Sequence, residues 1–339
     1  MKKLNATLAA LLVSVSATAA SAQTLQVAHA FVEGTIMGEM DKKFTDLVTE
    51  KTGGKLKFQF FWAGSLATGN EILNLLRDGA IQMGGTAPVY YTSDLPVVSL
   101  TNGTPFLFKN VKTAVNFQDA MSRSNPLFLA EYERMNIFPI LQHGLANSHL
   151  VCTKPVEKFE DLAGLKVRSF GVYLPAAIEA LGMVPVTLST NDTYEGLNRG
   201  VVDCVAMSYR DVIAFRYYEV AKYWTDLDFG ASSGSVLYAS WKNYKGGGWS
   251  PEIVATVDEV TREVMDLAAS KIIASQEDAV QEGLAAGITM IEFKDQDRVN
   301  AAVPDMLKIW RDRQVAEGLD AAAADEVVAA VRKAQADEK

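Results

Sequence analysis

One stretch of the sequence has the spacing of a known catalytic motif. Residues 230–234 read Gly-Ala-Ser-Ser-Gly and fit the G-x-S-x-G elbow of serine hydrolases. That elbow needs a helix directly after the serine and a histidine later in the chain. Residues 235–239 instead alternate like a strand, and the three histidines, His29, His143 and His149, all precede the motif. We therefore interpret residues 230–234 as a mobile connection between lobes rather than as a nucleophile.

Other reactive residue types give little support for catalysis. The three scattered histidines have no metal-ligand spacing, and no phosphate loop or dinucleotide fingerprint occurs, so we expect no metal and no cofactor. A paired-carboxylate site stays open, because the chain has 41 acidic residues and no motif singles any of them out. Cys152 and Cys204, the only cysteines, could form a disulfide or remain as two buried thiols. The sequence favours holding a molecule over converting one, and we expect no enzyme activity.

The N-terminus has the layout of a secretory signal peptide. Lys2 and Lys3 precede a small-residue and apolar stretch, and Ala20-Ser21-Ala22 provides a cleavage site, so residues 1–22 are expected to be removed on export. An uncleaved anchor is the alternative. No later window of about 18 apolar residues appears, which argues against stable membrane insertion. We expect a periplasmic location.

The charge of the chain limits its partners. The formal net charge is −9, and it becomes more negative once the signal peptide is removed. So acidic a chain is a poor candidate for binding nucleic acid. A small anion is still allowed, because one buried arginine can override the global charge at short range.

The elements that must position a binding site alternate between strand and helix. Strands are predicted at 25–29, 55–62, 80–86, 137–141, 148–153, 165–169, 184–188 and 201–207, and helices at 39–52, 70–78, 174–181 and 193–199. This alternation predicts parallel sheets covered by helices. The chain is also longer than a single hydrophobic core usually supports, so an α/β fold with two lobes is expected.

A long helix is predicted from 251 to 284. Ser250 is a good N-cap and Pro251 fits the first helical position. One apolar stripe follows, formed by Ile253, Val257, Val260, Val264 and Leu267. Such a helix would be roughly 50 Å long, so it must lie along both lobes or pair with another chain. The heptad pattern decays after Leu267, so we expect a monomer. Residues 320–339 are predicted to form a surface helix that frays into a tail.

Motifs spread over most of the chain carry a family resemblance. They include Val27-Ala28-His29, Trp62-Ala63-Gly64-Ser65-Leu66 and Pro105-Phe106-Leu107-Phe108, then F-E-D-L-A-G-L-K-V-R over 159–168, A-L-G-M-V-P-V over 180–186 and G-V-V-D over 200–203. From residue 25 to about 319 the chain resembles the DctP-type solute-binding proteins of tripartite ATP-independent periplasmic (TRAP) transporters. The resemblance implies a two-lobed periplasmic binding protein fold (type II-like), with hinge strands and a long helix spanning both lobes. It places lobe I at 23–146 plus about 234–273, and lobe II at 147–233 plus about 274–339.

The resemblance also implies a role for Arg168. In the family, the arginine that ends the G-L-K-x-R strand pairs with a ligand carboxylate, and Arg168 matches that position. A planar guanidinium offers two parallel donors to a carboxylate and stays charged at any relevant pH. The alternative is a structural salt bridge with a neighbouring acid.

Departures from the family pattern narrow the ligand. Ala206 and Met207 stand where many members carry polar residues that touch ligand or metal, which puts a metal-assisted 2-oxo-acid mode in doubt. No second arginine stands near Ser148 or His149, so a sialic acid is doubtful. Glu33 resembles an acid of ectoine-type binders that faces a cationic ligand group, although a solvated loop is an equal alternative.

Aromatic residues near strand ends complete the predicted site, because open α/β sheets bind ligands there. Each of them could instead belong to a core. With Met207 they suggest an acid with an apolar or aromatic body. The full predicted set is Arg168, Phe170, Glu33, Trp62, Tyr90, Tyr91, His149, Met207 and Tyr209.

The predicted function follows from the resemblance. We expect the substrate-binding component of a TRAP transporter, which captures a small carboxylate and delivers it to the membrane permease subunits. The alternatives are a ligand-binding sensor for a signalling receptor, an ectoine-like zwitterion binder, or a periplasmic enzyme on the same scaffold.

Overall fold

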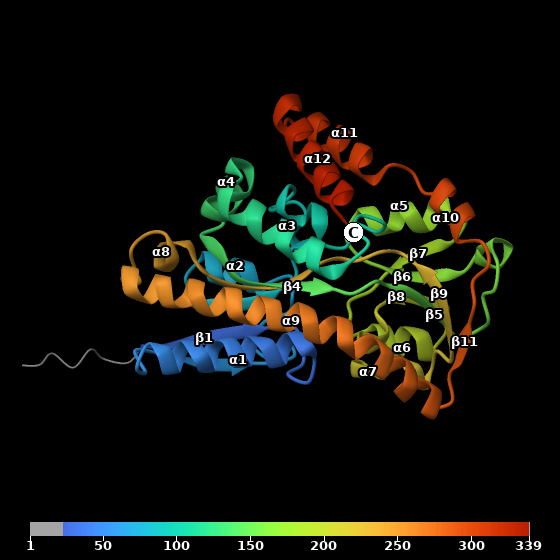
Figure 1. Ribbon diagram of the computed structural model, residues 1–339, viewed down its shortest axis with the longest axis horizontal. Helices are drawn as coiled ribbons and strands as arrows, with labels where there is room; N and C mark the ends of the chain where they lie inside the picture. Colours follow the sequence, from blue (N-terminus) through green and yellow to red (C-terminus); the bar gives the residue numbers. More distant parts are fainter. Residues whose placement is uncertain (1–22, 339) are drawn as a thin grey trace, which may run out of the picture.

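The computed structural model describes residues 23–338, so the predicted signal peptide at 1–22 lies outside the described residues. The described chain forms two lobes, each built on one mixed β-sheet with helices on both faces (Figure 1). Lobe I is defined here as the five-stranded sheet with its covering helices, and lobe II as the six-stranded sheet with its own. Within residues 23–338, no helix combines the length and the apolarity that crossing a membrane requires.

Lobe I has the strand order β2-β1-β3-β10-β4. Its strands are β1 (Gln23–His29), β2 (Leu56–Phe61), β3 (Met83–Thr86), β4 (Ile137–Leu145) and β10 (Ser232–Ser240). Side chains of β10 alternate between two cores, with Val236 and Tyr238 on one face and Leu237 and Ala239 on the other. Helices supply the opposing apolar surfaces: α1 (Ile36–Lys51), α2 (Ile72–Arg77), α3 (Val111–Ser124), α4 (Pro126–Arg134) and α8 (Trp241–Tyr244). Two 3-10 turns, η1 (Pro88–Tyr91) and η2 (Val98–Thr101), complete this lobe.

Lobe II has the strand order β11-β9-β5-β8-β6-β7. Its strands are β5 (His149–Cys152), β6 (Lys166–Ser169), β7 (Val184–Thr187), β8 (Cys204–Met207), β9 (Tyr223–Asp228) and β11 (Thr289–Ile291). Leu150 and Val151 of β5 again point into separate cores. The covering elements are α5 (Tyr173–Ala180), α6 (Thr193–Asn198), α7 (Tyr209–Ala214) and α10 (Gln296–Ala302), with the 3-10 turns η3 (Phe159–Leu162) and η4 (Tyr217–Glu219).

The two sheets are mixed, whereas the sequence predicted parallel sheets. β10 runs antiparallel to β3 and β4, and β5 runs antiparallel to β8 and β9. The physical reason is that β4 passes directly into β5, and β9 directly into β10, through short connections between the lobes. No crossover helix intervenes there, so nothing forces these strands to be parallel. Gly230 and Ala231 lie in the second of these connections, and residues 232–234 already form the start of β10, so no helix follows the serine and the serine-hydrolase elbow is absent.

The long helix α9 (Pro251–Ala285) contacts both lobes (Figure 1, orange). This was one of the two arrangements that the sequence allowed, the other being pairing with a second chain. Its 35 residues correspond to about 52 Å of helix. Val257, Val260 and Val264 pack into lobe I, and Ala279 packs into lobe II. Leu267 is 41% exposed, so the predicted stripe is wrong at its last position. Met265 and Ala268 are buried instead, because the apolar face continues around the helix.

The C-terminal helices return to lobe I. α11 (Met306–Ala316) and α12 (Ala321–Ala336) follow α10, and Trp310, Val327 and Val331 join a core of lobe I. The Glu338 carboxylate accepts the backbone N–H of Lys109 at 2.9 Å, beside the start of α3. The helix predicted in this region is present and lies at the surface, with Ala324, Val327 and Val331 buried. The described chain up to Glu338 is held against lobe I, so the predicted fraying tail is wrong for these residues. The lobe boundaries given above remain a prediction.

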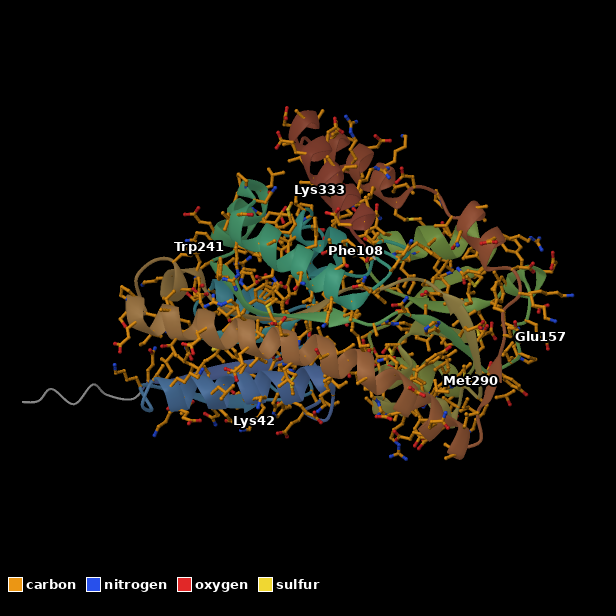
Figure 2. All side chains as sticks on the ribbon, in the orientation of Figure 1. Lys42, Phe108, Glu157, Trp241, Met290 and Lys333 are labelled. Atoms are coloured by element: carbon orange, nitrogen blue, oxygen red, sulfur yellow. A yellow bond between two sulfur atoms is a disulfide. The ribbon has the colours of Figure 1, made fainter. Side chains whose placement is uncertain are left out.

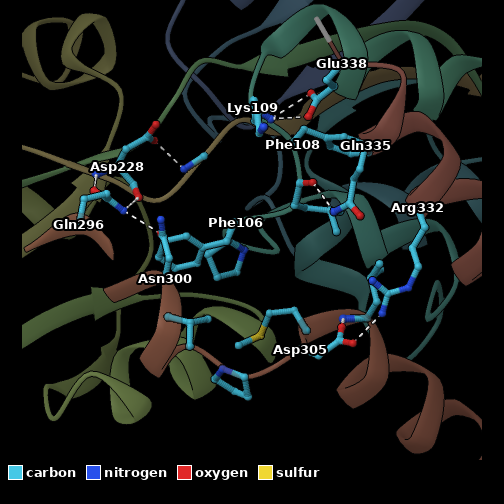
Figure 3. Close-up of a pocket in the computed structure, with 17 residues that line it drawn as sticks. Phe106, Phe108, Lys109, Asp228, Gln296, Asn300, Asp305, Arg332, Gln335 and Glu338 are labelled. Atoms are coloured by element: carbon cyan, nitrogen blue, oxygen red, sulfur yellow. Dashed lines mark hydrogen bonds and ion pairs between the residues drawn. The ribbon is translucent and has the colours of Figure 1, made fainter. Parts of the chain in front are cut away.

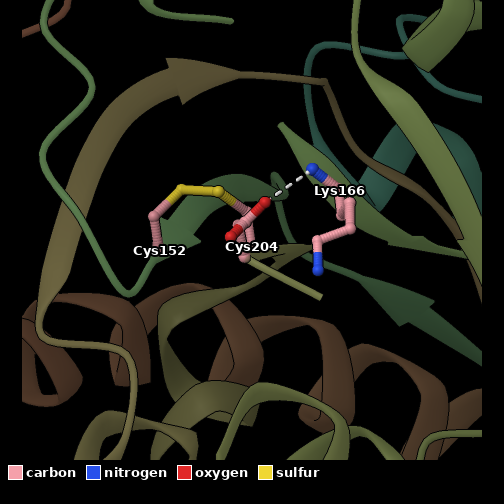
Figure 4. Close-up of a disulfide and its surroundings, with 4 residues drawn as sticks. Cys152, Lys166 and Cys204 are labelled. Atoms are coloured by element: carbon pink, nitrogen blue, oxygen red, sulfur yellow. Dashed lines mark hydrogen bonds between the residues drawn. A yellow bond between two sulfur atoms is a disulfide. The ribbon is translucent and has the colours of Figure 1, made fainter. Parts of the chain in front are cut away.

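A disulfide joins two neighbouring strands of lobe II. Cys152 of β5 lies directly opposite Cys204 of β8, and the two are bonded (Figure 4). Of the two possibilities that the sequence left open, a disulfide or two buried thiols, the structure has the disulfide. Charged side chains project from both lobes, for example Lys42 from the outer side of α1 and Glu157 from the far end of lobe II (Figure 2).

Candidate functional site

A cavity of about 70 Å³ lies between the two lobes. Lobe I lines it with residues that include Met37, Val89 and Tyr90, and lobe II with residues that include Arg168 and Met207. Arg168 stands on β6 and Met207 ends β8, so the cavity sits at strand ends of lobe II. Ligands commonly bind at such strand ends in open α/β sheets.

Arg168 is a buried positive charge in the lining of this cavity. Its side chain is only 2% exposed, and among the salt bridges of residues 23–338 none involves it. Nε donates to the Leu188 carbonyl at 3.1 Å and Nη2 to Thr190 Oγ1 at 3.2 Å, while the guanidinium carbon lies 4.4 Å from the centre of the Phe170 ring. Burial lowers the pKa of the guanidinium, and nearby tyrosine hydroxyls oppose that shift. Two of five N–H donors are thus used, and the rest remain available to an anion.

The structural salt bridge that was the alternative for Arg168 does not form. Within the described chain, the guanidinium pairs with a carbonyl and a hydroxyl, both uncharged. A buried cation without a counter-ion is costly unless a binding partner supplies one. The geometry therefore suits a ligand carboxylate.

One polar contact joins the lobes beside the arginine. Tyr90 Oη of lobe I lies 3.4 Å from Thr190 Oγ1 of lobe II. This contact stands between the cavity and a wider groove of about 630 Å³, and the two hollows share Phe31, Val89, Tyr90, Phe170 and Thr190. We interpret the groove as the approach to the cavity.

Four of the nine predicted site residues line the cavity: Arg168, Phe170, Tyr90 and Met207. Glu33 is exposed and Trp62 stacks on Phe60, and neither lines the cavity. The acid that motivated the zwitterion alternative is therefore not at this site.

The remaining three predicted residues are Tyr91, His149 and Tyr209, and each contacts other residues within its own lobe. Tyr91 is buried in lobe I, and its hydroxyl donates to the Gly69 carbonyl at 2.8 Å. Tyr209 is buried in lobe II, where it donates to the Thr225 carbonyl at 2.9 Å and stacks on His149. None of the three lines the cavity, because their rings pack into the lobes instead.

Sequence reasoning missed several cavity residues. Asn102, Ser148, Thr190 and Asp211 line it, and none stands in a motif that singles it out. Asp211 could have been noticed, because Ser208 and Asp211 have the spacing of a helix start. Nothing in the sequence indicated that this helix start faces the cleft.

A larger hollow of about 790 Å³ lies beside the C-terminal helices (Figure 3). Its charged side chains are mostly paired within the protein: Arg332 contacts Asp305 at 2.6 Å, and Asp228 accepts Asn147 Nδ2 at 2.8 Å. Lys109 is exposed to solvent. This hollow has no buried unpaired charge comparable to Arg168, so we place the candidate site between the lobes.

A buried polar cluster ties lobe I together close to the cleft. Asp41 of α1 accepts His29 Nε2 at 2.8 Å and His143 Nε2 at 2.7 Å, and all three side chains are buried. Desolvation raises the pKa of Asp41, but charge interaction and hydrogen bonding with the two histidines outweigh it, so the pKa is lowered overall. The cluster joins β1, α1 and β4, and β4 leads directly to the connection between the lobes.

Comparisons with known proteins agree with this architecture. Residues 27–314 match the family described as bacterial extracellular solute-binding protein, family 7 (DctP). The 2,3-diketo-L-gulonate-binding periplasmic protein of Escherichia coli K12 is 24% identical over 284 residues, covering 82% of this chain and 84% of its own. A solute-binding protein of a Sulfitobacter species is 28% identical over 309 residues, with 89% and 90% covered.

Solved structures show the same fold. A Bordetella pertussis extracytoplasmic solute receptor binding pyroglutamic acid superposes with a TM-score of 0.78 at 16% identity, covering 92% of this chain and all of that one. A TRAP periplasmic solute-binding protein of Roseobacter denitrificans with bound β-D-glucuronate gives 0.78 at 19% identity, covering 93% of this chain and all of that one. The family consists of solute-binding proteins, not enzymes. The chain belongs to bacterial extracellular solute-binding protein family 7, the DctP-type solute-binding proteins of TRAP transporters.

Proposed function

We propose that this protein works in the periplasm, where it captures a small organic acid by its carboxylate at Arg168 and delivers it to TRAP permease subunits. The observation that carries the proposal is the buried guanidinium of Arg168, which lies in a cavity between the lobes and has no counter-ion among residues 23–338. The relatives point the same way, since the ligands in their names, 2,3-diketo-L-gulonate, pyroglutamic acid and glucuronate, are all acids.

The cavity is small, but it adjoins the wider groove. A site needs about 10–15 Å³ to admit one water, so a cavity of about 70 Å³ holds a carboxylate and a few further groups, and a larger acid would extend towards the groove. None of the relatives' ligands just named is aromatic. We therefore do not extend the proposal to the aromatic body that the sequence suggested.

Closure would link binding to delivery. Arg168 donates to Thr190 of lobe II, and Thr190 approaches Tyr90 of lobe I. A ligand held by Arg168 in this gap would favour the closed arrangement, because the lobes contribute contacts to it only when they are together. The closed form would then be the one that a permease recognises.

A thermal-shift screen tests the proposal. The panel contains uronates, pyroglutamate, 2-oxo acids and C4-dicarboxylates, with uncharged sugars as negative controls. A ligand at 100 times its Kd adds about 2.7 kcal/mol to the free energy of unfolding, or on the order of 5 °C in a chain of this size. The Arg168→Ala variant should lose the response.

Arg199→Ala is the matched control, because Arg199 is an exposed arginine of the same lobe, paired with Glu195 at 2.9 Å. It should respond as the wild type does. An Arg168→Ala variant that still responds to the same acid with an unchanged Kd would contradict the proposal.

A further inference from the structure

Several polar residues of the cavity already make hydrogen bonds to other groups of the protein. Asn102 accepts the Val89 N–H at 2.8 Å through Oδ1 and donates to the Ser233 carbonyl at 2.7 Å through Nδ2. Ser235 Oγ donates to Met37 Sδ at 2.9 Å. These groups hold lobe I together and have little capacity left for a ligand.

Asp211, which also lines the cavity, has most of its hydrogen-bond acceptor positions unused. Its Oδ2 accepts one hydrogen bond, from Ser208 Oγ at 2.7 Å, while a carboxylate offers about four acceptor positions. Within residues 23–338 no salt bridge involves Asp211, and the neighbouring Arg210 is engaged with Glu282 at 2.6 Å. The nearby lining residue Met207 is apolar. Most of the acceptor capacity of Asp211 is therefore unused at the edge of the ligand cavity.

The electrostatics of Asp211 agree with this geometry. Burial raises the pKa of its carboxyl, while the hydrogen bond from Ser208 and the charge of Arg210 oppose the shift. A half-buried carboxylate with a single hydrogen bond from the protein is unfavourable where water cannot reach it, and a donor placed against it removes that cost.

We propose that Asp211 is a second anchor for the ligand, and that the ligand is an organic acid that also carries a hydroxyl or N–H donor. The proposal rests on the proposed function and refines its substrate class. Arg168 recognises the carboxylate, and Asp211 selects acids with a donor over otherwise similar acids that lack one. This second anchor takes the place of the polar groups that Ala206 and Met207 do not provide.

A purely structural role for Asp211 is the competing explanation. Ser208 caps α7 by accepting the Asp211 N–H at 3.2 Å, and this bond uses only the backbone of residue 211. The chain repeats this serine–aspartate pair in the turn before α6: Ser189 accepts the Asp192 N–H at 3.2 Å and donates to its carboxylate at 2.6 Å. Asp192 is exposed and lines the approach groove rather than the cavity, so it separates this local bonding from recognition inside the cavity.

The test measures Kd by calorimetry for pairs of acids that differ in one donor. L-Lactate is compared with propionate, and pyroglutamate with 3-oxocyclopentanecarboxylate, in which a methylene replaces the ring N–H. We expect the wild type to prefer the donor-bearing acid by on the order of tenfold or more, as is usual for a hydrogen bond to a charged group. In Asp211→Leu the ratio within each pair should fall towards one, and in Asp192→Leu it should stay at the wild-type value.

Three results would overturn the inference: an unchanged ratio in Asp211→Leu, equal binding within both pairs by the wild type, or no binding of any of the four acids. If Asp211→Leu fails to fold, Asp211→Asn replaces it. Its neutral carbonyl accepts more weakly than a carboxylate, so the ratio should fall at least about threefold. Arg168→Ala separates the two proposals: if it leaves every Kd unchanged, the proposed function fails, whereas a donor preference that is insensitive to Asp211 removes only this inference.

Discussion

Replacing Arg168 by methionine should affect stability and binding in opposite directions. Methionine has a similar length and no charge, so Arg168→Met removes a cation that is 2% exposed and has no counter-ion in the described chain. Its hydrogen bonds to Leu188 and Thr190 are lost, at about 1 kcal/mol each. The desolvation penalty of a buried ion, which is several kcal/mol, disappears as well. We therefore expect the free energy of unfolding without ligand to stay level or to rise by about 0–2 kcal/mol.

Ligand affinity should fall sharply in the same variant. A bound carboxylate would lose its ion pair while remaining buried, which typically costs about 2–5 kcal/mol. At about 1.4 kcal/mol for each factor of ten, the Kd should rise roughly 30-fold to several thousand-fold.

Urea unfolding without ligand, and calorimetry with the acid that stabilises the wild type most, measure the two effects separately. Arg199→Met should change neither quantity by much, since Arg199 is 75% exposed. A loss of more than about 3 kcal/mol in unfolding free energy, with a Kd that changes less than threefold, would refute the reasoning. Arg168 would then be a structural residue.

Three further predictions concern closure, covalent structure and pH. Tyr90→Phe removes the hydroxyl that contacts Thr190 across the lobes, so we expect a Kd about two- to tenfold weaker, with most of the change in the dissociation rate measured by stopped flow. An unchanged dissociation rate would exclude this contact as a clasp. Breaking the disulfide by Cys152→Ala with Cys204→Ala should lower the unfolding free energy by about 2–4 kcal/mol in urea titrations and leave the Kd within about threefold, which a large loss of affinity would contradict. Burial raises the pKa of Glu131 to about 7, so the folded state binds this proton more tightly than the unfolded chain does. Its contribution to stability is complete below about pH 4.5 and is lost as pH rises through about 7, by on the order of 3 kcal/mol. Subtracting the pH profile of Glu131→Gln from that of the wild type should reveal this fall, and a flat difference would refute it.

Local sequence patterns predicted most of the strands and about half of the helices, and they missed α3, α4, α7, α8, α10 and α11. Ser250 and Pro251 marked the start of α9, which begins at Pro251 in the structure. The length of that helix required support from two lobes or a second chain, and the structure has both lobes in contact with it. Strand direction could not be predicted from local patterns. β4 and β10 each connect to the other lobe, and their antiparallel pairing depends on contacts between residues far apart in the chain.

The site was harder to predict than the fold. Arg168 was found through the resemblance, and physical chemistry then explained why an arginine suits the position. Tyr90 and Tyr91 are adjacent, yet one faces the cavity and the other donates into the core, a difference set by the 3-10 turn that carries them. Asp211 is one acid among 41 acidic residues, and only the packing of α7 beside the cavity distinguishes it. The disulfide likewise depends on the register that sets Cys152 opposite Cys204.

A crystal structure of the wild type with a bound acid would test the central claim most directly. We expect the ligand between the lobes, with its carboxylate oxygens about 2.7–2.9 Å from guanidinium nitrogens of Arg168. An acid seated elsewhere, with the guanidinium still bonded only to Leu188 and Thr190, would contradict the account.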